Sequence, residues 1–278
     1  METNKKIIEL LNNVKLKNPL VHHITNYVTV NDCANITLAI GGSPVMAEDI
    51  NEVCDMVELA SALVINIGTL NATSIKSMIT AGKRANELNI PVILDPVGAG
   101  ATSYRTDTAK RIIGEVKLAV IRGNLSEIKT LSGIEAKTKG VDACVNVSDN
   151  SNELMMEKEM AIVLANKLNT VVAITGVIDI ITDGKILYTV ENGHKMMCKV
   201  TGTGCMCTSL IGSYLGAGDN TLLAALAGVV SMGIAGEIAY EGLDKSKGGT
   251  GSLKVKIIDA IYNLSEDDIM KRSKINEE

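Results

Sequence analysis

The chain has 278 residues, of which 46% are hydrophobic, and this is enough to bury a substantial core. A formal net charge of −5 excludes a nucleic-acid backbone or an anionic membrane surface as an electrostatically favoured partner, and with no Trp or Phe the chain offers no aromatic platform for stacking bases. The six Cys show no regular framework and no second Cys or His pair stands at metal-ligand spacing, so we interpret them as reduced thiols.

The N-terminal ten residues have an amphipathic helical pattern without the apolar core of a signal peptide. The longest apolar run, residues 222–235, is shorter than a bilayer is thick and soon reaches Glu237. We interpret this run as a buried core helix. The sequence therefore predicts a cytoplasmic protein with no membrane partner.

Short β-branched runs alternate with longer stretches of helical period, which indicates a mostly parallel, buried sheet flanked by helices. The runs are residues 63–67, 91–94, 118–121 and 170–174. Two more extended runs, residues 179–182 and 185–190, are separated by Asp183-Gly184, a pair that favours a two-residue hairpin turn. We therefore expect an α/β fold with an antiparallel edge hairpin.

No linker or internal repeat divides the chain, so we expect a single domain over residues 1–278. Residues 133–152 are the most loop-like interior stretch. The charged tail, residues 265–278, is expected to fray.

Polar residues follow the predicted strands at the points where the strands end. In a parallel sheet these ends meet at one edge, where ligands bind. The polar segments are Gly68-Thr69, Asp95, Arg122–Asn124 and Thr175-Gly176. This edge is therefore where we expect the chemistry of the protein.

Two acidic residues at this edge are candidate Mg²⁺ ligands. A carboxylate where a buried strand emerges, as at Asp95, suits a hard cation that prefers oxygen ligands, although Asp95 is equally suited to capping the turn before Pro96. Asn124-Leu-Ser-Glu127 also fits a capping box, in which Glu127 reaches back to the first N–H of a helix. The residues alone leave both alternatives open.

Arg122 follows an apolar strand, and its permanent charge there requires an anionic partner. A phosphate suits the donor fork of the guanidinium, and the alternative is an ion pair with a nearby Asp or Glu.

The segment Val200-Thr-Gly-Thr-Gly-Cys205 precedes a predicted helix that includes residues 206–215. Its glycines and the positive helix end predict an anion site made by the backbone of Gly202, Thr203 and Gly204, unless the glycines serve only to bend the chain. Cys205, on the first turn, places a polar side chain beside that anion. With Asp95, Glu127 and Arg122, the segment supplies the parts that phosphoryl transfer requires.

Two glycine-rich segments imitate other sites. Gly98-Ala-Gly100 follows a strand like a dinucleotide fingerprint but lacks the third glycine, because residue 103 is Ser. The segment 216–219 ends in Asp219 and, like residues 200–205, precedes a predicted helix, but no strand leads into it. We expect Gly216 and Gly218 to end one helix and Asp219 to cap the next.

Five motifs together resemble the hydroxyethylthiazole kinase family, and the resemblance runs from about His22 to Gly251. The motifs are residues 23–32, 42–47, 94–100, 121–127 and 200–205. The resemblance implies a ribokinase-like three-layer α/β/α fold, ATP-dependent phosphorylation of 4-methyl-5-(2-hydroxyethyl)thiazole in thiamine salvage, and a homotrimer with active sites shared between subunits. It also implies a role for each matching residue: ATP contacts for Arg122 and Thr175, Mg²⁺ binding for Asp95 and Glu127, thiazole contacts for Met46 and Gly202, and a place in the substrate pocket for Asn26.

Most ribokinase-like enzymes carry Asp as the catalytic base at the position of Cys205, whereas the thiazole kinases have Cys. A thiol is only slightly ionised near neutrality, so Cys205 acts either as a base or by orienting the accepting hydroxyl. Two other functions stay open on the sequence alone. They are a related kinase for hydroxymethylpyrimidine or pyridoxal, and a nucleotide-sensing module that has lost turnover.

Overall fold

The computed structural model describes residues 1–133, 151–244 and 246–278. The strands in these ranges form one sheet in the order β2-β1-β3-β4-β5-β6-β7-β8-β9. The parallel part consists of β1 (Leu20–Ile24), β2 (Ser43–Met46), β3 (Ala62–Asn66), β4 (Val92–Asp95), β5 (Val120–Asn124) and β6 (Val171–Thr175). The antiparallel part adds β7 (Asp179–Thr182), β8 (Leu187–Val190) and β9 (Ile275–Glu277). The predicted mostly parallel sheet with an antiparallel edge is confirmed.

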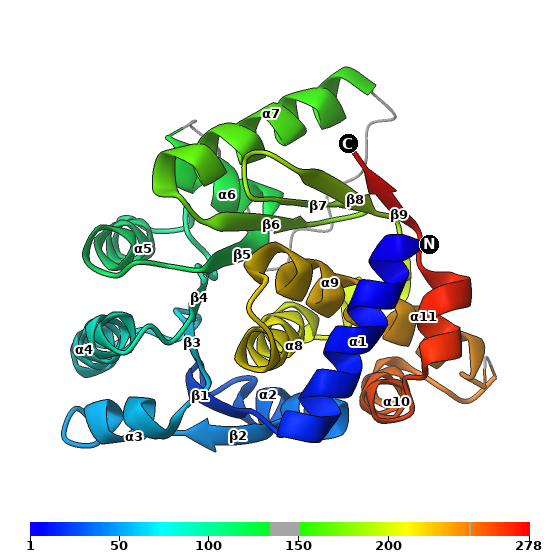
Figure 1. Cartoon of the computed structure of the whole chain (residues 1–278), viewed down its shortest axis with the longest axis horizontal. Coiled ribbons are helices and arrows are strands. Elements are labelled where there is room, and N and C mark those ends of the chain that lie inside the picture. The colour runs from blue at the N-terminus through cyan, green and yellow to red at the C-terminus, as the bar shows by residue number, and fades with distance from the viewer. Residues whose placement is uncertain (134–150, 245) are drawn as a thin grey trace.

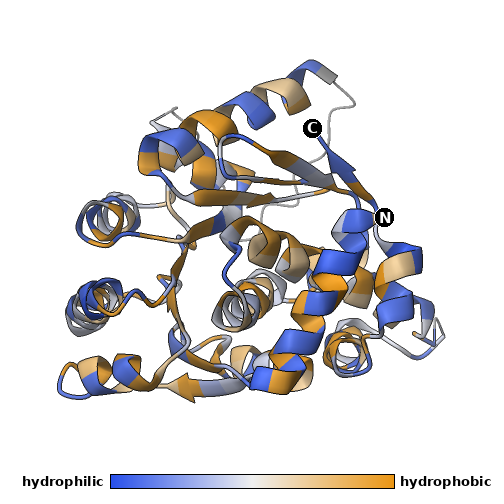
Figure 2. Ribbon diagram, viewed as in Figure 1, coloured by the Kyte–Doolittle hydropathy of each residue, from blue (hydrophilic) through white to orange (hydrophobic). Residues whose placement is uncertain are grey.

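Helices cover both faces of the sheet and make three layers (Figure 1). One face carries α3 (Val53–Leu59), α4 (Ala72–Glu87), α5 (Ser103–Glu115), α6 (Leu125–Ser132) and α7 (Ser151–Leu168). The other face carries α1 (Glu2–Lys17), α2 (Val30–Ile40), α8 (Thr203–Ala217), α9 (Thr221–Glu241), α10 (Thr250–Tyr262) and α11 (Glu266–Arg272). Each face encloses its own cluster of buried apolar side chains, and Figure 2 shows the apolar sides of these helices turned toward the sheet.

The two most buried helices are α8 and α9. Their close packing on one another keeps α8 in place against the sheet. A Cβ atom at Gly228 of α9 would lie 2.4 Å from Ile211 Cγ1 of α8, so this glycine permits the close approach of the two helices. Helix α9 is long and apolar enough to cross a membrane by composition, but most of it is buried inside the protein. The predicted core helix at residues 222–235 therefore lies within α9.

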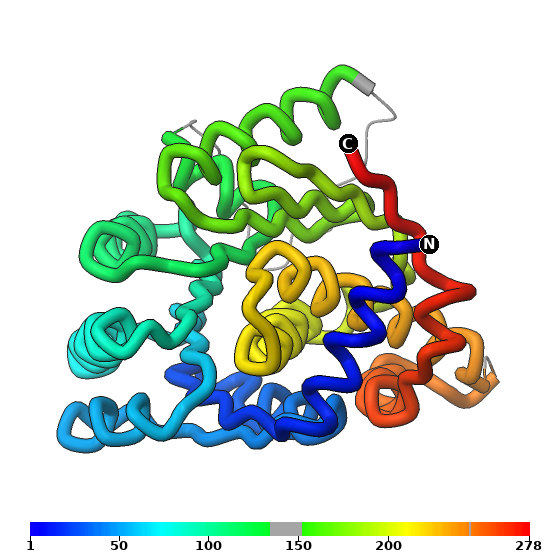
Figure 3. Tube along the Cα trace, viewed as in Figure 1, coloured from blue at the N-terminus to red at the C-terminus, as the bar shows by residue number. Residues whose placement is uncertain are grey.

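The charged tail does not fray as expected, because it forms α11 and β9. Ile269 of α11 is fully buried, and β9 pairs with β8 over residues 275–277. The start of α1 lies beside this tail, with Thr3 Oγ1 3.4 Å from Glu277 Oε2, and in Figure 3 the blue N-terminal end lies next to the red segment that leads to the C-terminus. The expected loop at residues 133–152 lies largely outside the described residues, and its last two residues begin α7.

Candidate active site

The carboxyl ends of four neighbouring strands bring polar side chains to one edge of the sheet. Asn66 and Asp95 end β3 and β4 and are paired in the sheet register, as are Asn124 and Thr175 at the ends of β5 and β6. Arg122 lies two residues before the end of β5. Since consecutive residues of a strand point to opposite faces, Arg122 and Asn124 share one face.

The N-terminus of α8 faces this edge. Gly202 caps the helix with φ 90°, a left-handed conformation that favours glycine, and a Cβ atom there would lie 2.9 Å from Thr29 Cγ2. No side chain caps α8, and in the described ranges no acceptor meets the backbone N–H groups of residues 203–205. The first turn of α8 therefore presents uncompensated donors and the positive end of a 15-residue helix. A 3₁₀ helix, η1 (Lys195–Lys199), precedes the turn.

The guanidinium of Arg122 lies against the same helix end. Its Nη2 donates to the hydroxyl of Thr175, and its Nη1 is the atom that a Cβ at Gly204 would approach to 2.5 Å. Only 11% of the side chain is exposed. Burial disfavours the charge, but neighbouring acidic groups, led by Asp95, raise the pKa of Arg122 above its ordinary value. A permanent cation thus stands beside the bare N–H groups of α8.

Asp95 is fully buried, and its two oxygens have different surroundings. Oδ2 accepts hydrogen bonds from Asn66 Nδ2 at 3.0 Å and from Thr208 Oγ1 at 2.9 Å. Oδ1 is buried with no hydrogen-bond partner. Burial raises the pKa of Asp95 despite the attraction of Arg122. An orphaned carboxylate oxygen of this kind fits a cation that seeks oxygen ligands.

Glu127 forms the capping box that its sequence predicts. Its Oε2 accepts from the Asn124 N–H at 2.8 Å, while Asn124 Oδ1 accepts from the Glu127 N–H at 2.9 Å. Its Oε1 accepts from the Gly98 N–H at 2.8 Å. Burial and repulsion from Asp95 raise the pKa of Glu127 to about 7, against the effect of the two N–H donors. Glu127 therefore holds the loop after Asp95 in place.

Across the described part of the chain, no group of three or more His, Cys, Asp or Glu side chains could hold a metal.

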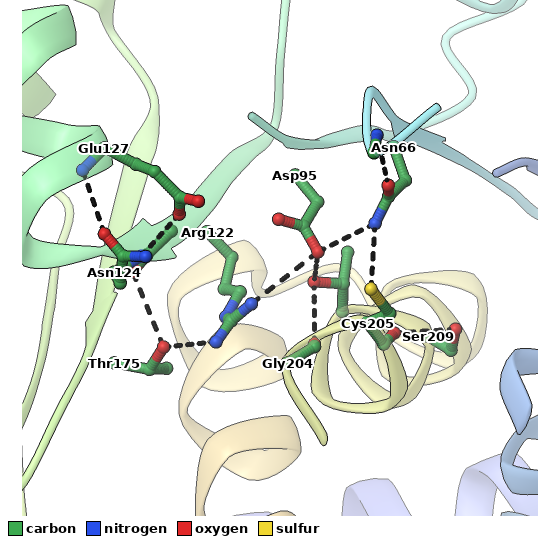
Figure 4. A network of polar contacts seen from close by, with 12 residues as sticks. Asn66, Asp95, Arg122, Asn124, Glu127, Thr175, Gly204, Cys205 and Ser209 are labelled. Atoms are coloured by element: carbon green, nitrogen blue, oxygen red, sulfur yellow. Dashed lines mark hydrogen bonds and ion pairs between the residues drawn. The ribbon is translucent and has the colours of Figure 1, made fainter. Parts of the chain in front are cut away.

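Cys205 lies on the first turn of α8, beside Asp95 (Figure 4). Its sulfur accepts two amide N–H bonds, from Asn66 Nδ2 at 3.3 Å and from Asn26 Nδ2 at 3.4 Å. Burial and the charge of Asp95 raise the pKa of Cys205, against the effect of hydrogen bonds from Thr29 and Asn26 and of the charge of Arg122. The thiol form therefore predominates near neutral pH, with its sulfur held by two donors.

Hydrogen bonds and close contacts join Arg122 to Asp95, Thr175 and Gly204, and a separate hydrogen bond joins Asn26 to Cys205. The hydrogen bonds of Glu127 go to Gly98 and Asn124, which were not candidates. Met46 ends β2, which is two strands from β3 and so about 10 Å away along the sheet. It shares the edge but makes no direct contact with Cys205 that the structure records. Gly202 packs on Thr29 at the start of α2.

Sequence reasoning missed Asn66 and Thr208, which bind Asp95 from two sides. The sequence predicts a strand over residues 63–67 that ends at Ile67, so we looked for polar residues from Gly68 onward, whereas β3 ends at Asn66. The available signal was a single Asn inside the apolar run of residues 63–67.

Both imitating segments prove to have structural roles. The N–H groups of Gly98 and Gly100 bond to Glu127 Oε1 and Thr106 Oγ1, so neither is free to hold a phosphate. Asp219 lies beyond the C-terminal end of α8, which ends about 18 Å from Cys205 at 1.5 Å per residue. We expected Asp219 to cap α9, but this prediction is wrong. Asn220 is the capping residue, and its side chain accepts the Leu223 N–H.

Comparisons with known proteins agree over nearly the whole chain. A model of the hydroxyethylthiazole kinase family matches residues 11–267. The hydroxyethylthiazole kinase of Clostridium tetani is 59% identical over 276 residues, which cover 99% of each chain. The solved hydroxyethylthiazole kinase of Pyrococcus horikoshii is 40% identical with a TM-score of 0.88, again over 99% of each chain. The pyridoxal kinase of Staphylococcus aureus, solved with pyridoxal, is 15% identical with a TM-score of 0.64 over 93% of this chain and 97% of its own, and shows a shared fold. The expected ribokinase-like architecture is confirmed.

Proposed function

This chain belongs to the hydroxyethylthiazole kinase family, and we propose that it transfers the phosphoryl group at the place where Cys205, Arg122 and Asp95 lie close together. The chain is an ATP-dependent kinase that phosphorylates the hydroxyl of 4-methyl-5-(2-hydroxyethyl)thiazole, a step of thiamine salvage. One observation carries the assignment. The Arg122 guanidinium and the bare N–H groups of α8 converge beside the Cys205 thiol.

The ATP phosphates bind to Arg122, to Thr175 and to the anion hole formed by Gly202, Thr203 and Gly204. Arg122 is already held by the Thr175 hydroxyl, so little reorganisation is needed when the phosphates arrive. In the loose transition state of phosphoryl transfer, charge spreads over the equatorial oxygens. A fixed guanidinium and fixed N–H donors stabilise that charge without reorienting, which is the main source of rate enhancement in this proposal.

Asp95 is the side chain that would hold Mg²⁺, because its Oδ1 is buried and unpartnered. Glu127 contributes chiefly through its charge, since both of its oxygens already accept backbone N–H bonds. When bound, Mg²⁺ would neutralise part of the phosphate charge. Asn66 and Thr208 keep Asp95 Oδ2 occupied, so the carboxylate is oriented before any cation arrives.

The thiazole alcohol binds with its hydroxyl next to Cys205. The two amide donors occupy the lone pairs of the sulfur, so the thiol proton is free to turn toward that hydroxyl. Cys205 therefore orients the accepting oxygen, and strong basicity is not required in a loose transition state. Asn26, Met46 and Gly202 form the surrounding pocket at the same edge of the sheet.

A thiol-protection experiment tests this placement. Iodoacetamide is added to the free enzyme at an alkaline pH that ionises thiols, and peptide mass spectrometry follows the extent of labelling of Cys205 over time. Hydroxyethylthiazole should slow the labelling of Cys205 by at least about 5-fold, while Cys54 on α3 is labelled at an unchanged rate. Equal protection of both residues, or of neither, would contradict the assignment.

We also propose a cytoplasmic homotrimer with active sites at its subunit interfaces. Two large apolar side chains beside the site support this, because Tyr27 is 79% exposed and Val28 is 59% exposed, directly after Asn26. Most of α9 is buried inside the protein, which supports the proposal that this helix is not a membrane anchor. Light scattering coupled to size exclusion should give three times the mass of 29.4 kDa, and a monomeric mass would contradict the proposal.

A further inference from the structure

Asn66 at the end of β3 lies between Cys205 and Asp95 and is only 1% exposed. Its Oδ1 faces the Gly68 N–H at 2.9 Å and the Asn26 Nδ2 at 2.9 Å. A backbone N–H can only donate, so the atom that faces Gly68 must be the oxygen of the amide. The amide orientation is therefore fixed, and its NH₂ group points to the other side.

That NH₂ group donates to Cys205 Sγ at 3.3 Å and to Asp95 Oδ2 at 3.0 Å. Both hydrogens of one amide are thus used on two residues that come from different elements, α8 and β4. The chain provides no second side chain in the described ranges that bonds both groups. Asn66 therefore sets the distance between the thiol and the carboxylate (Figure 4).

We propose that Asn66 is a positioning residue for phosphoryl transfer, which holds the Cys205 thiol in register with Asp95 through the two hydrogens of its amide. The proposal rests on the proposed function, because it takes Cys205 as the residue beside the accepting hydroxyl. Asn66 acts on the rate through Cys205 rather than through ATP binding. A small misplacement of a catalytic group lowers turnover strongly, by about 10²-fold for 1 Å.

A double-mutant cycle on turnover tests the proposal, using Asn66→Ala, Cys205→Ala and the double variant. We expect Asn66→Ala to lower kcat by about 30-fold and to change the KM for ATP by less than about 3-fold. In the Cys205→Ala background the same change should lower kcat by less than about 3-fold, because the group that Asn66 positions is gone.

Thr208→Val is the matched control, because it removes the other donor to Asp95 Oδ2 without touching the sulfur. Its effect on kcat should be the same factor in both backgrounds. If Asn66→Ala fails to fold, Asn66→Leu runs the same cycle, since it fills a similar volume, adds no charge beside Asp95 and has no NH₂ donors.

The proposal is overturned if Asn66→Ala leaves kcat unchanged, or if it lowers kcat by equal factors with and without the Cys205 thiol. Turnover of the unmodified enzyme on hydroxyethylthiazole is measured in the same series. Absence of that turnover would refute the proposed function, and a normal rate with no coupling would refute only the role of Asn66.

Discussion

Arg122 Nη1 lies 3.6 Å from Asp95 Oδ2, across the gap between the ends of β5 and β4. The two charges stabilise each other while both are largely removed from water. This distance is long for an ion pair, and each of the two residues has a further group or atom available for a ligand. Arg122 faces the N-terminus of α8, and Asp95 keeps Oδ1 free. In the proposed function, phosphate and cation would thus bind to groups that are already charged and already in place.

Replacing Arg122 should remove transition-state stabilisation. Arg122→Lys keeps one positive charge but loses the planar fork, and we expect kcat/KM for ATP to fall by about 10²- to 10³-fold. Steady-state kinetics checks this. Arg84→Lys, in a solvent-exposed ion-pair cluster with Glu58 and Glu87, is the control and should leave the rate unchanged. A loss of less than about 3-fold in Arg122→Lys would mean that phosphates bind elsewhere.

Asp95→Asn tests the metal assignment. The neutral amide binds a divalent cation poorly, so the Mg²⁺ concentration that gives half-maximal rate should rise by at least about 10-fold, and maximal turnover should fall. Rates measured across a Mg²⁺ titration give both quantities. An unchanged Mg²⁺ dependence would remove Asp95 from the metal site.

Alanine substitutions at two glycines in equivalent helix positions distinguish a steric effect from an effect on helix propensity. Gly204 and Gly251 are the second residues of α8 and α10. A Cβ at Gly204 would lie 2.5 Å from Arg122 Nη1, whereas one at Gly251 would meet nothing within 4 Å. Gly204→Ala should therefore displace the guanidinium and lower kcat/KM for ATP by at least about 10-fold. Gly251→Ala should leave the rate unchanged, and equal kinetics for the two variants would show that Arg122 adapts without loss.

The substitutions Cys205→Ser and Asp219→Asn test which of two glycine-containing turns, residues 202–205 or residues 216–219, carries the catalytic side chain. Asp219 is exposed and lies beyond the far end of α8, so Asp219→Asn should leave kcat within about 2-fold of the original. Cys205→Ser changes the atom that we propose to lie beside the accepting hydroxyl and should lower kcat by at least about 10-fold. If the loss in Asp219→Asn matched that in Cys205→Ser, we would have chosen the wrong turn.

Asp179 should make stability depend on pH. Burial raises its pKa from 3.8 to about 7, although its carboxylate accepts the Gly176 N–H at 2.8 Å. Between these values the folded state keeps a proton that the unfolded chain has released, so stability falls as the pH rises through this window.

Asp179→Asn keeps an oxygen for Gly176 and abolishes the titration. We expect little change in Tm at pH 4.5 and an increase of about 3–8 °C at pH 8, measured by circular dichroism. Asp219→Asn, at an exposed position, is the control and should shift Tm equally at both values of pH. An equal shift at both values for Asp179→Asn would mean that Asp179 is ionised in the folded protein throughout.

The buried parallel strands could be predicted because each is a continuous apolar run. Strand β1 was hidden by His22 and His23, whose ring nitrogens bond Ala47 O at 2.7 Å and Ser209 Oγ at 3.2 Å. These partners exist only in the folded chain. Strand β2 contains Pro44, which is tolerated because β2 is an edge strand.

The candidate site shows the same division. Asp95 and Arg122 could be found because each stands alone at the end of an apolar run. The roles of Asn66 and Thr208 could not be predicted, because they depend on contacts with Cys205 and Asp95, which lie 139 and 113 positions away in the chain. Local pattern carries no information about such pairs. The same limit applies to Glu127, whose cap was visible in the sequence while its bond to Gly98 was not.

A coupled ADP-release assay with ATP and Mg²⁺ tests the proposed reaction itself. Hydroxyethylthiazole, hydroxymethylpyrimidine and pyridoxal are offered separately, and mass spectrometry gives the mass of each product. We predict ADP release that depends on hydroxyethylthiazole, with a thiazole monophosphate as product and much slower release with the other two alcohols. Folded protein that binds ATP but releases no ADP with the thiazole would contradict the account.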